Sequence, residues 1–134
     1  MGWKTGGGAA RRWHITSTEI SELSFPLLGE VCEQAYTYAV AFHGWNKNYI
    51  GVGGRDHVRR DEVVEGLRAA LGPSMEVRVE SSGGLSGNSP RNLVNRITAS
   101  GSNGVHIEQP LPARQEYWEL IADAVAEVYK RWID

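Results

Sequence analysis

A continuous apolar run from Tyr38 to Phe42, closed by His43 and Gly44, places the strongest constraint on how this chain can fold. A strand that is apolar on both faces is typical of the interior of a mostly parallel sheet covered by helices on both sides. The run is too short to span a membrane, which takes about 20 apolar residues. We therefore expect an α/β domain with this strand at the centre of its sheet.

The rest of the chain alternates between further strands and helices. Short β-prone segments predict a strand end at 13–16 and strands at 48–52, 75–80 and 104–108. Helical patterns predict helices at 26–34, 61–71 and 118–132. Turn residues predict a loop at 81–92, and the segment 94–98 has no clear preference for helix or strand. This order predicts a mixed, mostly parallel sheet flanked by helices.

Length and composition limit the organisation of the chain. A length of 134 residues predicts a single α/β domain, 13–134, after a flexible Gly-rich lead at 1–12. The net charge of -2 argues against a nucleic-acid partner. One cysteine, Cys32, excludes an intramolecular disulfide framework and a multi-cysteine zinc cluster. The start lacks the apolar stretch of a signal peptide, so we expect no membrane partner and a cytoplasmic protein, or one released on lysis.

Two expectations concern individual side chains around the predicted helices. The Trp and Tyr residues of the last helix fall on its apolar stripe, so we expect them in the core. Arg59 and Arg60 precede the helix at 61–71, and we expect them to face water.

Candidate chemistry gathers where strands end, because function in open α/β sheets collects at the carboxyl ends of strands. His43, Arg96 and Glu108 stand at such positions. A neutral imidazole is a good zinc ligand, and a carboxylate beside a metal can act as a general base. A histidine after a strand is more often a hydrogen-bonded turn residue, and a glutamate there more often a solvated carboxylate. Five arginines could bind an anionic substrate, although exposed arginines are common: Arg55, Arg59, Arg60, Arg91 and Arg96.

Other chemistries have weaker support. Cys32 has no evident histidine partner, which argues against a cysteine nucleophile. The segment 51–54, Gly-Val-Gly-Gly, lacks both the dinucleotide fingerprint and the Lys-Ser/Thr of a phosphate-binding P-loop. The chain has no Gly-x-Ser-x-Gly nucleophile elbow.

Five short blocks, in order, resemble the phage-type poly-γ-glutamate hydrolase family. They are Trp-His-Ile-Thr-Ser-Thr at 13–18, Val-Ala-Phe-His-Gly at 40–44, Val-Gly-Gly-Arg-Asp at 52–56, Asn-Leu-Val-Asn-Arg at 92–96 and Gly-Val-His-Ile-Glu at 104–108. The resemblance implies a metallocarboxypeptidase-like α/β fold. It also implies a zinc-dependent peptidase that cuts the γ-linked glutamate polymer of bacterial capsules.

The resemblance also assigns roles by position. His43 matches a zinc ligand of the family, and Glu108 matches the catalytic glutamate that activates the attacking water. Asn95 and Arg96 match a pair that holds a substrate carboxylate, a role that suits the fork-shaped guanidinium. With Arg55 as a further contact, the sequence predicts a hydrolase of γ-glutamyl amide bonds with zinc as cofactor and an anionic γ-glutamyl polymer as substrate.

The chain departs from the family pattern at its start. Family members begin with a further segment whose His-x-x-Glu or His-x-x-x-Glu block supplies two more zinc ligands. None of the four histidines here is followed by Glu at that spacing. We therefore expect the first strands of the sheet to be absent, which would leave an exposed edge.

Several explanations stay open at the level of sequence, and with them the question of whether the chain is an enzyme. Three alternatives explain the missing zinc ligands. The first is that the recorded start is too late, and the second is that the chain is a degenerate relative. The third is that a partner chain or oligomer completes the site. The chain is then a hydrolase, a non-catalytic module that binds acidic polyglutamate-like ligands, or a fragment with no stable fold of its own.

Overall fold

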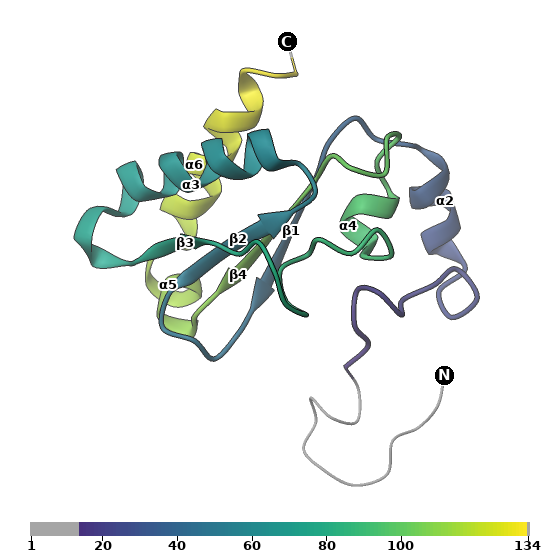
Figure 1. Ribbon diagram of the computed structural model, residues 1–134, viewed down its shortest axis with the longest axis horizontal. Coiled ribbons are helices and arrows are strands. Elements are labelled where there is room, and N and C mark those ends of the chain that lie inside the picture. Colours follow the sequence, from purple (N-terminus) through teal and green to yellow (C-terminus); the bar gives the residue numbers. More distant parts are fainter. Residues whose placement is uncertain (1–13, 134) are drawn as a thin grey trace, which may run out of the picture.

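The computed structural model describes residues 14–133, so the predicted lead at 1–12 lies outside the described residues. Four strands form one sheet in the order β1 (Ala39–Gly44), β4 (Gly104–Gln109), β2 (Ile50–Gly54) and β3 (Val77–Val79). The pairs β1–β4 and β2–β3 are parallel, whereas β2 and β4 are antiparallel. The predicted fold class, a mixed sheet flanked by helices, is confirmed (Figure 1).

Helices cover the sheet and connect its strands. They are α2 (Leu27–Glu33), α3 (His57–Leu71), the short 3-10 helix η1 (Gly72–Ser74), α4 (Leu93–Arg96), α5 (Leu111–Glu116) and α6 (Trp118–Lys130). In Figure 1, α3 and α6 lie together above the sheet, and α4 and α2 lie to its right. Within residues 14–133, none of these helices is long and apolar enough to cross a membrane.

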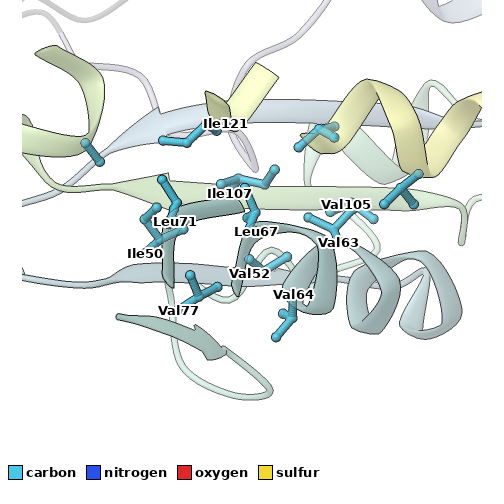
Figure 2. Close-up of a cluster of buried hydrophobic side chains, with 13 residues drawn as sticks. Ile50, Val52, Val63, Val64, Leu67, Leu71, Val77, Val105, Ile107 and Ile121 are labelled. Atoms are coloured by element: carbon cyan, nitrogen blue, oxygen red, sulfur yellow. The ribbon is translucent and has the colours of Figure 1, made fainter. Parts of the chain in front are cut away.

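The hydrophobic core lies between the sheet and the helices α3 and α6. Ile50, Val52, Val105 and Ile107 come from the strands and are fully buried against residues such as Leu67 of α3 (Figure 2). Because side chains alternate along a strand, this arrangement turns the intervening residues of β2 and β4 to the opposite face of the sheet. That opposite face carries the polar side chains considered below.

The expected central strand lies at an edge of the sheet, and that prediction is wrong. Among the described strands, β1 pairs with β4 on one side only. Phe42 on this strand is 49% exposed. An apolar run looks the same in sequence for a strand covered on both sides and for an edge strand with exposed apolar side chains. Only pairing between segments distinguishes the two.

Two glycines let other segments pack directly on β2. A Cβ at Gly53 would lie 1.9 Å from the Ser86 carbonyl oxygen, and a Cβ at Gly51 would lie 2.4 Å from Cη2 of Trp45. The loop at 81–92, as predicted, has no regular secondary structure and crosses β2 at this point. Gly51 pairs with Glu108, so Trp45 lies on the same face of the sheet as that carboxylate.

Several element boundaries differ from expectation. Residues 14–16 form no strand, and the ambiguous region at 94–98 holds the end of α4. Helix α3 begins before the predicted residue 61, because Asp56 caps it by accepting a hydrogen bond of 3.1 Å from the backbone N–H of Arg59. Helix α5 was not predicted. It starts after Pro110 and has Pro112 as its second residue, a position in the first helical turn that tolerates proline.

The expectations for aromatic and arginine side chains near the helices are partly wrong. Trp118, the first residue of α6, is 57% exposed, and Trp132, which comes after the last residue of α6, is 40% exposed. Arg59 does not simply face water. Its guanidinium lies 3.9 Å from the Trp132 ring centroid and 3.4 Å from the Asp56 carboxylate. Arg60 is also largely covered, with an exposed fraction of 13%, and it pairs with Asp61 at 2.8 Å.

Candidate functional site

The pairing of two parallel strands brings three potential metal ligands together. His43 of β1 lies opposite Glu108 of β4, and Ala41 lies opposite His106. Strand alternation turns these side chains away from the hydrophobic core. The donor atoms of His43, His106 and Glu108 all lie within 4.8 Å of one another. We call these three residues the His–Glu cluster.

Two members of the cluster, His106 and Glu108, are buried and His43 is partly buried, and internal contacts hold the three together. His106 Nε2 and Glu108 Oε1 are 3.0 Å apart, and both side chains are 5% exposed. The rings of His43 and His106 stack with centroids 4.2 Å apart. Glu108 Oε2 and His106 Nδ1 are buried without a hydrogen-bond partner in the described part of the chain. Because an unpartnered buried polar atom is costly, the free carboxylate oxygen points to a ligand or a catalytic role.

The surroundings of His43 keep its imidazole neutral. Burial is the main factor that lowers the pKa of His43, and the nearby His106 and His14 lower it further, whereas Glu108 acts in the opposite direction. A pKa below the ordinary value leaves the ring without a positive charge at neutral pH. The free lone pair of a neutral imidazole is what a metal ligand requires.

A loop clamped by Asn95 covers His106. Gly87 has φ +69°, and a Cβ there would lie 2.3 Å from Cβ of His106, so only glycine permits this approach. The fully buried Asn95 donates hydrogen bonds from Nδ2 to the carbonyl oxygens of Gly87 (2.8 Å) and Ser89 (2.9 Å). The predicted site residue Asn95 therefore reaches the cluster through the loop, and its amide hydrogens are engaged there.

The other two predicted substrate residues lie elsewhere. Arg96, at the end of α4, donates from Nη2 to the carbonyl oxygen of Ile20 at 2.5 Å. Arg55 follows β2, which is antiparallel to β4, so it lies beside Gly104 where β4 begins. Gly104 and Glu108 are four positions apart along β4, which corresponds to about 13 Å. The structure thus unites His43 with Glu108 but does not bring Arg55 to them.

Sequence reasoning did not propose His106 as a site residue. The signal that could have found it is the spacing His106-x-Glu108 on a predicted strand, which places both side chains on one face. Its contact with His43 could not be read from spacing, because it depends on the pairing of β1 with β4.

The residue types of the cluster fit zinc. Two imidazoles and one carboxylate form one of the usual protein ligand sets of catalytic zinc sites. In a tetrahedral site, ligands at 2.0–2.2 Å from one zinc ion lie about 3.3–3.6 Å apart. The donor atoms of the cluster, which all lie within 4.8 Å of one another, would have to move up to about 1 Å closer together to bind one ion.

The fold and the cluster define an α/β protein with a candidate metal site at the carboxyl ends of two parallel strands. A family model described as poly-gamma-glutamate hydrolase matches residues 4–127, and the chain belongs to this family. Among curated proteins, no sequence matches.

Two solved structures are similar to the chain. The first is a bacteriophage poly-gamma-glutamate hydrolase, with 26% identity and a TM-score of 0.70; the match covers 89% of this chain and 62% of that chain. The second is a protein called YNDL in a zinc-free apo form, with 22% identity and a TM-score of 0.72; the match covers 98% of this chain and 69% of that chain. The second match shows a shared fold. The chain spans less than two thirds of the length of the phage enzyme.

Proposed function

We propose that the chain is a zinc-dependent hydrolase domain that cleaves γ-glutamyl amide bonds of poly-γ-glutamate. Membership of the family and the likeness to the phage hydrolase support this substrate class. The observation that carries the proposal is the pairing of His43 with Glu108 across β1 and β4, which leaves a buried carboxylate oxygen without a partner beside a neutral imidazole.

Each residue of the His–Glu cluster has a distinct part in this proposal. His43 would hold zinc. Zinc, when bound, supplies Lewis-acid polarisation of the scissile carbonyl. Glu108 Oε2 takes the proton of the attacking water and passes it to the leaving amine. His106 holds Glu108 in place through the contact of 3.0 Å between His106 Nε2 and Glu108 Oε1. The other ring nitrogen, Nδ1, lies against Gly87 and has no hydrogen-bond partner among the described residues. His106 is therefore a positioning residue.

The three predicted substrate-binding residues lie in different places, and their proposed roles differ accordingly. Arg96 is the proposed anchor of a substrate carboxylate, which would replace the Ile20 carbonyl as its acceptor. Asn95 contributes by holding the loop over His106. Arg55 is proposed to contact only a distant unit of a long polymer, since it lies at the other end of β4.

The test compares zinc content and hydrolysis of poly-γ-glutamate in the full chain and three variants. We expect His43→Ala to lose both zinc and activity. Glu108→Gln should keep zinc and lose about 100-fold or more in kcat, because general-base catalysis typically contributes 100- to 10,000-fold. His106→Ala should keep zinc and lower kcat by roughly tenfold, since Glu108 would lose its orienting hydrogen bond.

Two outcomes would change the assignment. Loss of zinc in both Glu108→Gln and His106→Ala would make all three cluster residues ligands and remove Glu108 as the base. A wild-type chain with neither zinc nor hydrolysis would overturn the proposal. If that chain still bound the polymer, more weakly at high salt, it would be a non-catalytic module for acidic ligands.

A further inference from the structure

A cation held by a tryptophan ring and a tyrosine hydroxyl lies on the same face of the sheet as the His–Glu cluster. Lys47 Nζ is 4.2 Å from the ring centroid of Trp45 and 5.3 Å from that of Tyr49. The ammonium also donates a hydrogen bond of 3.0 Å to the Tyr49 hydroxyl, which in turn donates to Glu80 Oε1 at 2.8 Å. We call Trp45, Lys47 and Tyr49 the Lys47 clamp.

Strand register locates the clamp relative to Glu108. Gly51 pairs with Glu108 across neighbouring strands, and Trp45 Cη2 lies 2.4 Å from the position of a Cβ on Gly51. Paired residues of antiparallel strands are about 5 Å apart. The Trp45 ring therefore stands beside Glu108, and the ammonium of Lys47 lies 4.2 Å from the centroid of that ring. Added together, these spacings limit the distance from the ammonium to Glu108 to roughly 14 Å.

Lys47 differs from an ordinary surface lysine in two respects. A lysine at the surface usually samples many rotamers, but the rings and the hydroxyl fix this one. It also forms no ion pair within residues 14–133, whereas its neighbour Arg78 is engaged by both carboxylate oxygens of Glu76, at 2.6 and 2.9 Å. The hydrogen bond to Tyr49 is the main factor that raises the pKa of Lys47, so its charge is secure at neutral pH.

We propose that Lys47, held by Trp45 and Tyr49, binds the carboxylate of a glutamyl unit about two units from the bond that is cut. The inference rests on the proposed function. An α-peptide unit of three backbone bonds spans up to about 3.6 Å, so a γ-linked unit of five bonds spans roughly 6 Å. Two such units fit within this limit on the separation between Glu108 and Lys47. A pre-positioned cation binds with less loss of side-chain entropy than a mobile one.

The experiment measures binding of γ-linked glutamate oligomers, a dimer and a hexamer, by titration calorimetry. It uses the full chain in a Glu108→Gln background, so that the oligomers stay intact. We expect Lys47→Gln to weaken hexamer binding by about three- to tenfold and to leave dimer binding unchanged. Lys47→Arg, which keeps the charge and can stack on the rings, should retain most of the affinity. Lys130→Gln is the matched control, because Lys130 is exposed on α6 and pairs with Glu127.

The possible outcomes distinguish a failure of the Lys47 subsite from a failure of the proposed hydrolase function. Equal hexamer affinity in Lys47→Gln and the parent would overturn the subsite while leaving the proposed hydrolase intact. An equal loss for dimer and hexamer, with a lower melting temperature, would make the clamp a structural brace and also overturn the subsite. If the parent chain bound neither oligomer and the wild type did not cleave the polymer, the proposed function itself would fail, and the subsite with it.

Discussion

Individual side chains show two kinds of buried polar group without a partner. Glu108 Oε2 lies in the His–Glu cluster, where a substrate or a water could use it. The Tyr129 hydroxyl is also buried without a hydrogen-bond partner in the described part of the chain, but it lies on the core side of the molecule, near Asp56. The unpartnered oxygen of Glu108 is consistent with a functional role, whereas the unpartnered hydroxyl of Tyr129 only lowers the stability of the fold.

The first prediction concerns Tyr129. Burial is the main factor that raises the pKa of its phenol above the ordinary value, and the Asp56 carboxylate adds to it. In the unfolded chain the phenol ionises near pH 10, so the folded state loses stability as the pH rises beyond that value, by up to about 1.4 kcal/mol per pH unit. Tyr129→Phe should remove this alkaline loss and should be neutral or up to about 1 kcal/mol more stable at pH 7.

Urea unfolding of the wild type and the Tyr129→Phe variant at pH 7 and at pH 11 measures this effect. The free energy of unfolding should fall more steeply with pH in the wild type than in the variant. Equal slopes in the two proteins would contradict the predicted contribution of Tyr129.

At the scale of elements, the site is built by packing a loop and a short helix on one face of the sheet. Helix α4 places Asn95 where its amide holds the carbonyl oxygens of Gly87 and Ser89. Gly53 leaves the space that the Ser86 carbonyl occupies. Both details fix the course of the loop at 81–92, which has no regular secondary structure to stabilise it.

The second prediction tests how Asn95 holds the loop at 81–92. Asn95→Ala removes two hydrogen bonds and leaves two covered carbonyl oxygens without donors, so it should lower stability by about 2–4 kcal/mol. The loop should also become more accessible, which hydrogen exchange at 81–92 would detect. The matched control is Asn103→Ala, because Asn103 donates a single exposed hydrogen bond of 2.9 Å to the Thr37 carbonyl. Similar losses in the two variants would argue against a special role of Asn95.

At the scale of the whole molecule, the cluster depends on the pairing of two strands from distant parts of the chain. A ligand that binds His43 on β1 together with groups near Glu108 on β4 would tie these strands together. Its binding energy would then add to the stability of the entire fold, since the unfolded chain does not hold these residues together.

The third prediction follows from this linkage. Zinc at about 100 times its Kd should stabilise the folded chain by about 2.7 kcal/mol. For a chain of this size that stabilisation corresponds to a rise in Tm of roughly 10 °C. Differential scanning calorimetry with zinc, and then with a chelator, would measure the rise and its reversal. The His43→Ala variant should show no rise. An identical shift in this variant would place the metal elsewhere on the protein.

The location of most secondary structure could be predicted from the chain, because local patterns carry it. The stripe of Ile121, Val125 and Val128 predicted α6, and the turn residues at 81–92 predicted the loop. The position of β1 at the sheet edge could not be predicted, since pairing partners lie far apart in sequence. For the same reason, the contact of His106 with His43 was missed and Arg55 was expected at the same site as Glu108.

The sequence by itself determined the class of fold, the elements and the family, because periodicity, turn residues and ordered motifs are local properties of the chain. It also marked His43 and Glu108 as residues at strand ends. Only the tertiary structure decided that these two side chains meet, that His106 joins them, and that Trp45 and Tyr49 hold Lys47 on the same face of the sheet. Strand order, direction and register decide such meetings, and they arise from packing between segments that are distant along the chain.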